Sequence, residues 1–183
     1  AAALLLAETP VAGTAQAPAA VQALNADLLA HASATEVLQR RCTDRHLADP
    51  PVIRAIRVRG ADKVADAQVR ALLRASPGEI VRYRHVRLVC GARVLSDADN
   101  WYRPARLTAD MNRRLDTTDT PFGAVVRPLD FHRRTIAVAF PDRASGPYIL
   151  RHRAVLVTAA GVPFSVVEER YTREAAGVTA PDR

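Results

Sequence analysis

The sequence has few of the residues that build metal sites, disulfide scaffolds or membrane spans. It contains two cysteines in 183 residues, Cys42 and Cys90, and these lack the spacing of metal ligands. The five histidines show no metal-binding motif either. Apolar runs stay well short of the roughly 18–20 residues that a membrane-spanning helix needs. We therefore expect no metal, no cofactor and no membrane partner.

Aromatic side chains and lysines are also scarce. Aromatic residues make up 5% of the chain, and Lys63 is the only lysine. The formal net charge is nevertheless +7, with a pI near 10.4, because arginine supplies the positive charge. The arginines are scattered through the predicted elements and are not interleaved with aromatics, so we expect no nucleic-acid partner. Small anionic ligands suit an excess of arginine at least as well.

The composition is otherwise that of one globular domain. Hydrophobic residues make up 49% and charged residues 25%, and the length is sufficient for a real core. We predict a domain over residues 21–175, a flexible leader over 1–20 and a flexible tail over 176–183. Residues 1–17 are Ala-rich and end in Ala-Gln-Ala, which is typical of the end of a secretory signal peptide. This interpretation predicts a periplasmic or secreted protein; the alternative is a flexible leader on a cytoplasmic one.

Hydrophobic periodicity predicts an α+β domain with antiparallel strands and a few segregated helices. A helix is expected over 21–42 with a break at Ser33, a second from Asp62 to Ser76, and a third over 109–115. A helical turn is expected through Val126. The alternating segments predict strands over residues 52–58, 80–89, 94–102, 135–140, 149–157 and 164–171.

Strand alternation places three charged residues on faces that look buried. Arg84, Arg134 and Glu168 each share the apolar side of their strand. An unpaired buried charge costs several kcal/mol, so these groups must pair or face a polar cavity. Two interpretations stay open, namely a structural arginine–glutamate pair and an anion-binding pocket with two arginines and one carboxylate.

The loop over residues 117–123 and the two cysteines each allow a structural and a functional interpretation. Residues 117–123 (TTDTPFG) predict a loop in which Pro121 restricts the chain and Gly123 allows close backbone approach. Free backbone N–H groups there would bind a carboxylate, although a plain turn would need no function. Cys42 and Cys90 are either two small buried hydrophobic residues or, in an exported protein, one disulfide.

The order of several short motifs resembles the chorismate lyase superfamily. In chain order these motifs are Arg84-His85-Val86-Arg87-Leu88, a hairpin ending at Tyr102-Arg103-Pro104, Asp119-Thr120-Pro121-Phe122-Gly123, and Pro163-Phe164-Ser165-Val166-Val167-Glu168. The resemblance covers residues 24–173. It implies a single antiparallel β-sheet with flanking helices that enclose an internal ligand cavity.

The resemblance also implies an activity and a site. Enzymes of the superfamily eliminate pyruvate from chorismate to give 4-hydroxybenzoate, without a cofactor. By this resemblance Arg84 would bind a substrate carboxylate, the backbone N–H of Phe122 beside Gly123 would orient it, and Glu168 would act as general acid/base. Where the family has a second arginine, Asn100 stands nearby; its amide can hydrogen-bond a ligand but cannot neutralise a carboxylate. Arg134 is the predicted source of the missing charge.

The superfamily also contains the UTRA-type ligand-sensing domain of GntR-type regulators. Ser76-Pro77-Gly78-Glu79 and Trp101-Tyr102-Arg103-Pro104 resemble that branch. The residues before the second helix do not follow the pattern of a winged DNA-binding domain, so we do not expect a regulator. The functions left open are a chorismate lyase-like enzyme, a non-catalytic protein that binds a small aromatic or cyclohexadiene carboxylate, and a domain whose inward charges are only structural.

Overall fold

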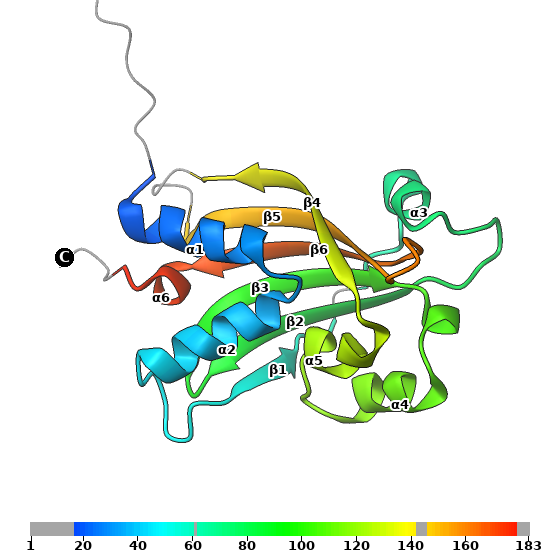
Figure 1. Ribbon diagram of the computed structural model, residues 1–183. Coiled ribbons are helices and arrows are strands. Elements are labelled where there is room, and N and C mark those ends of the chain that lie inside the picture. Colours follow the sequence, from blue (N-terminus) through cyan, green and yellow to red (C-terminus); the bar gives the residue numbers. More distant parts are fainter. Residues whose placement is uncertain (1–16, 61, 142–145, 179–183) are drawn as a thin grey trace, which may run out of the picture.

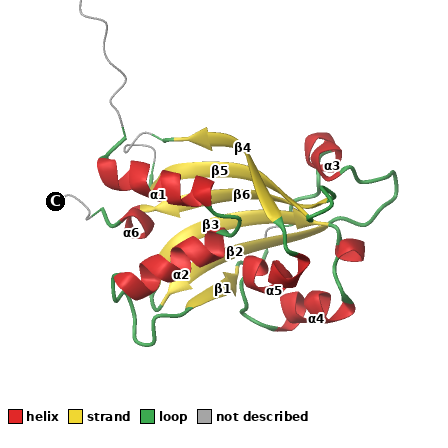
Figure 2. Cartoon of the chain, in the orientation of Figure 1, coloured by secondary structure: helices red, strands yellow, loops and turns green. Residues whose placement is uncertain are grey.

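The sheet is the centre of the computed structural model, which describes residues 17–60, 62–141 and 146–178. Six strands form one antiparallel sheet in the order β1-β2-β3-β6-β5-β4 (Figures 1 and 2). They are β1 (Ile53–Arg57), β2 (Arg82–Cys90), β3 (Arg93–Tyr102), β4 (His132–Ala139), β5 (Tyr148–Val157) and β6 (Pro163–Thr172). Each predicted strand is confirmed, with ends that differ by three residues at most.

Six α-helices accompany the sheet in the described residues. They are α1 (Ala19–Ala30), α2 (Ala34–Asp44), α3 (Ala67–Leu73), α4 (Ala109–Thr117), α5 (Phe122–Val126) and α6 (Arg173–Ala176), with short 3₁₀ turns at Pro104–Arg106 and Arg127–Leu129. The predicted break at Ser33 is confirmed, because Ser33 caps α2 by accepting a hydrogen bond from the backbone N–H of Glu36.

The prediction that a helix opens at Asp62 is wrong. Helix α3 begins at Ala67, and the carboxylate of Asp66 caps it by accepting from the backbone N–H of Val69 at 2.7 Å. Lys63 is instead held on the sheet, because its carbonyl accepts from the Trp101 indole and its ammonium pairs with Asp99. Both aspartates are good cap residues, and only these tertiary contacts select the later one.

The two faces of the sheet differ in their cover. We call the face covered by α1, α2, α4, α5 and α6 the inner face, and the opposite face the outer face (Figure 1). The inner face carries Arg84, Asn100, Glu169 and Tyr171, among others. On the outer face α3 covers one end only, where Val69 and Leu73 pack on Trp101, Val155 and Val166.

The core lies between the inner face and the helices. Val21, Leu24 and Leu28 of α1 and Val37 and Leu38 of α2 pack there. A Cys42–Cys90 disulfide joins α2 to the end of β2 across 48 residues of chain. Of the two interpretations that the sequence left open for these cysteines, the structure has the disulfide.

The prediction that Glu168 and Arg134 point inward is wrong. In β6 the residues from Pro163 to Val167 are all buried, because α3 covers the outer face there, so apolar residues do not mark one face. In β4, an edge strand, a register shift between Thr135 and Ala137 breaks the alternation that linked Arg134 to the apolar residues after it. Glu169 and Arg133, one position away in each strand, face inward instead.

The predicted termini lie mostly beyond what can be described. The predicted signal-peptide end at 15–17 and most of the predicted leader and tail lie outside the described residues. None of the helices in residues 17–60, 62–141 and 146–178 is long and apolar enough to cross a membrane.

Candidate functional site

A cavity of about 50 Å³ lies between the inner face and the helices. Its polar lining comes from Ser33 and Thr35 at the start of α2, Asn100 of β3, Arg133 of β4 and Glu169 of β6. The apolar lining is Ala32, Ala34, Val86, Leu88, Ala98, Phe122, Gly123, Phe131, Leu156 and Val167. An internal cavity of this kind, walled by the sheet and the helices, is the feature that the fold resemblance implies.

Arg84 does not itself line this cavity, but it adjoins two residues that do. Its cross-strand partner Asn100 and its neighbour on the same face, Val86, both line the cavity. The residue is 3% exposed, and the guanidinium makes no hydrogen bond or ion pair with any described residue. Burial and the nearby charge of Arg57 lower the pKa of Arg84, although an arginine stays protonated at any physiological pH.

Asn100 is held in place by a neighbour from β6. Its Oδ1 accepts a hydrogen bond from the Ser165 hydroxyl at 2.6 Å, inside the sheet. That contact leaves the amide N–H groups as the donors that Asn100 presents beside Arg84. Two of the predicted site residues, Arg84 and Asn100, are therefore brought together.

Glu169 and Arg133 form a buried ion pair at the cavity wall. The side chains are 9% and 3% exposed, and the Tyr171 hydroxyl donates to the same Glu169 carboxylate at 2.8 Å. Burial opposes the charge on Arg133, but the attraction of Glu169 outweighs it and raises the pKa of Arg133. Both charges of this pair are thus satisfied within the protein.

His152 completes the polar part of the inner face. Burial, with the charge of Arg133 as a further cause, lowers the pKa of His152 to about 4. The ring is therefore neutral at pH 7. Its Nε2 lies 2.8 Å from the side-chain oxygen of Asn25 on α1, so Nε2 carries the proton and donates.

The loop with Pro121 and Gly123 brings α5 against α2. Gly123 lies so close to α2 that a Cβ there would sit 2.8 Å from the Ser33 hydroxyl oxygen and 3.0 Å from that of Thr35. The sequence predicted that Gly123 allows the backbone to approach a ligand; the close approach that the structure shows is to the first turn of α2. The Phe122 ring packs on Tyr102 and Phe164 and forms part of the cavity wall.

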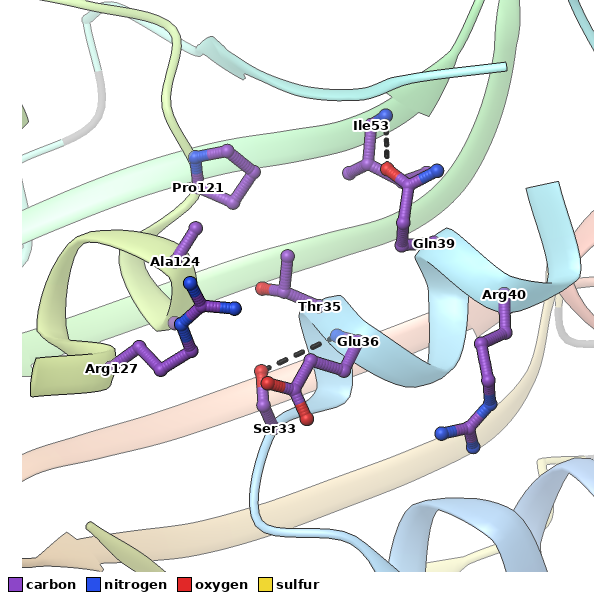
Figure 3. Close-up of a pocket in the computed structure, with 10 residues that line it drawn as sticks. Ser33, Thr35, Glu36, Gln39, Arg40, Ile53, Pro121, Ala124 and Arg127 are labelled. Atoms are coloured by element: carbon purple, nitrogen blue, oxygen red, sulfur yellow. Dashed lines mark hydrogen bonds between the residues drawn. The ribbon is translucent and has the colours of Figure 1, made fainter. Parts of the chain in front are cut away.

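A groove of about 450 Å³ lies on the other side of the same contact (Figure 3). Ser33, Thr35 and Gly123 line both the groove and the cavity. Figure 3 shows Glu36 and Arg127 on opposite walls of the groove, from α2 and from the segment after α5. The α2–α5 contact therefore lies between the cavity and this groove.

The two remaining predicted site residues are not brought to the cavity. Glu168 is on the outer face, where its carboxylate lies 3.2 Å from Nε of Arg153. Arg134 is on the outer face too and is exposed. The sequence reasoning missed Arg133 and Glu169; each adjoins a residue of the same charge, and only the strand register distinguishes the members of each pair. Among the described residues no cluster of three or more His, Cys, Asp or Glu side chains could hold a metal ion.

Solved structures share this fold. A crystal structure of PhnF from Mycobacterium smegmatis superposes with a TM-score of 0.53 at 16% identity, over 72% of this chain and 63%, less than two thirds, of that chain. The effector domain of the same protein gives a TM-score of 0.50 at 14% identity, over 66% of this chain and 80% of that domain. At such identities the likeness concerns the fold alone, and it confirms the predicted α+β architecture of one antiparallel sheet with flanking helices.

Sequence comparison finds a relative with a higher identity than these structures. No protein-family model matches the sequence. The uncharacterized protein y4mC of Sinorhizobium fredii is 45% identical over 187 aligned residues, which cover 91% of this chain and 79% of that protein. The chain therefore belongs to the same family as y4mC of Sinorhizobium fredii.

Proposed function

We propose that the protein binds a small anionic ligand, a carboxylate, in the inner cavity, with Arg84 as its counter-ion. The observation that carries this proposal is the buried Arg84 guanidinium, which has no acceptor among the described residues. A carboxylate accepts two parallel hydrogen bonds from a guanidinium, so it would supply the missing partner. The amide of Asn100 beside it adds a neutral donor.

The cavity walls support a ligand with a flat apolar body. Phe122 and Phe131 line the cavity, and their rings would pack on an aromatic or cyclohexadiene ring. A volume of 50 Å³ holds only one or two water molecules at about 30 Å³ each. A ring-sized ligand therefore needs more room than this, which a shift at the α2–α5 contact beside Gly123 would provide. The matching structure from PhnF is described as an effector domain, and this description supports ligand sensing by the fold.

We propose binding without turnover. Elimination of pyruvate needs a free acid/base group at the ligand. Glu168, the residue predicted for that role, is across the sheet, and Glu169 is already engaged by Arg133 and Tyr171. Incubation of the purified protein with chorismate should give no 4-hydroxybenzoate, and product formed at a rate proportional to enzyme concentration would contradict this.

Binding is tested by thermal shift with benzoate, 4-hydroxybenzoate and chorismate. At least one of these should raise the melting temperature of the wild type, because a ligand that binds only the folded state stabilises it. The shift should vanish in Arg84→Gln and persist in Arg82→Gln. Arg82 is the matched control, since it lies two residues away on the same strand and its side chain is 46% exposed. Equal shifts in both variants, or none in the wild type, would reject the site.

We also propose that the protein works in an oxidising compartment such as the periplasm. The Cys42–Cys90 disulfide supports this location, because disulfides persist in exported proteins and are rare in the cytosol. Cell fractionation tests it: recovery of the native protein only in the cytosolic fraction, with reduced thiols, would count against it.

A further inference from the structure

The outer face of the sheet carries an uneven distribution of charge. On the β2, β3 and β6 side, every carboxylate is paired. Asp97 contacts Arg170, Arg87 and His85, and Asp99 contacts Arg170, Lys63 and the Tyr83 hydroxyl. These two aspartates are 5% and 0% exposed at the side chain, so their charges are fully used within the protein.

The β5 and β4 side lacks such compensation. Arg151 is exposed and has no hydrogen bond or ion pair with any described residue. Arg153 donates through Nη1 to Gln68 at 2.7 Å, and its Nε is 3.2 Å from Glu168 but lacks a well-aligned acceptor. The surplus of positive charge therefore lies at β5.

A basin of about 200 Å³ lies at this place. Its side-chain walls on the outer face are Arg151 and Arg153 of β5, Glu168 and Arg170 of β6, and the small residues Ala137 and Ala139 of β4. The alanines leave room that larger side chains would fill. Arg151 and Arg153 are two residues apart on one strand, which spaces them by about 6.6 Å along the same face.

We propose that this basin is a second ligand site, separate from the inner cavity, which takes the phosphoryl group of a small phosphorylated compound. Arg170 is already paired with Asp97 and Asp99, so the surplus comes from Arg151 and Arg153 against the carboxylate of Glu168, a formal charge of +1. A phosphate monoester carries about −1.5 to −2 at neutral pH and has three acceptor oxygens, so this surplus attracts it and its oxygens suit the forked guanidinium donors. Arg151 binds the phosphoryl group with its exposed guanidinium, and the charge of Arg153 on the same strand adds to the attraction.

Calorimetric titration at low ionic strength tests this site, with glucose 6-phosphate as the probe and glucose as the neutral control. The wild type should bind the phosphate ester and not the sugar. The double variant Arg151→Gln, Arg153→Gln should bind it at least about tenfold more weakly, because it loses charge-assisted hydrogen bonds. The matched control is Arg54→Gln, an exposed arginine of β1 on the same face at the opposite edge; its affinity should equal that of the wild type. Melting temperatures verify that all variants fold.

Three results would overturn the proposal. The first is equal affinity in the double variant, or no binding of glucose 6-phosphate by the wild type. The second is a loss of phosphate binding in Arg84→Gln instead, which would place the phosphoryl group in the inner cavity. The third is tighter binding of a short single-stranded oligonucleotide that Arg54→Gln also weakens, which would indicate a polyanion surface over the whole outer face.

Discussion

Replacing Arg84 with methionine should make the ligand-free protein more stable. Methionine has a similar length and removes the charge. In the wild type Arg84 is 3% exposed and its guanidinium has no partner among the described residues. The cost of removing its charge from water is therefore not offset by a hydrogen bond or ion pair in the folded state. A residue retained at a cost to stability is typical of a binding site.

The expected gain is about 1–3 kcal/mol, the range in which buried ionic groups are improved by apolar replacements. Two electrostatic effects partly cancel. The substitution removes the repulsion from Arg57, and it also removes the attraction of Asp116 and Asp119. With a urea dependence of roughly 2 kcal/mol per molar, the unfolding midpoint should rise by about 0.5–1.5 M.

Urea unfolding followed by the fluorescence of Trp101 measures this directly, because Trp101 is the only tryptophan and is 6% exposed in the fold. Arg82→Met is the control. Its half-exposed pair with Asp116 contributes no more than about 1 kcal/mol, so its midpoint should hardly move. A fall of more than about 1 kcal/mol for Arg84→Met would refute the reasoning, because it would mean that Arg84 has a structural role.

Two further predictions concern the α2–α5 contact and the inner face. Gly123→Ala should lower stability by about 1–3 kcal/mol, because the new Cβ meets Ser33 Oγ at 2.8 Å, and the loss should shrink in a Ser33→Ala background; additive losses in chemical unfolding would argue against the contact. The pKa of His152 is about 4 in the fold and 6.5 in an unfolded chain, so the unfolded state binds more protons between these values. Stability from this group is complete above pH 6.5 and falls by up to about 3 kcal/mol toward pH 4. His152→Gln should flatten that part of the stability–pH curve, and an unchanged slope would show that other groups cause it.

Strand alternation located Arg84 correctly because β2 has one covered face and one open face over that stretch. Its residues alternate between buried and more exposed positions from Arg84 to Leu88. The same rule failed in β6, where helices on both sides bury five successive residues. It failed in β4 for the opposite reason, since an edge strand with a shifted register exposes even its apolar residues.

Other features depend on contacts between distant segments, which a single sequence does not contain. The proximity of Cys42 to Cys90 depends on how α2 crosses the end of β2. The choice of Asp66 over Asp62 as helix cap depends on Trp101 and Asp99 holding Lys63. Sequence order and local pattern were sufficient for the fold and for Arg84, whereas the partner of each buried charge had to be found in three dimensions.

The treatment of buried charge elsewhere in the molecule is what makes Arg84 informative. Every other charged residue that is buried in the described part has an opposite charge in contact. Arg103 is forked onto Glu79 and also donates to two carbonyls, Glu169 pairs with Arg133, and the two buried aspartates of β3 share Arg170. The other four buried charges are all paired, and Arg84 is not. Carboxylates that could pair with it are present nearby, since Asp116 and Asp119 are close enough to influence the pKa of Arg84. The buried and unpaired guanidinium of Arg84 is therefore the observation that supports our proposal of a carboxylate ligand at this place.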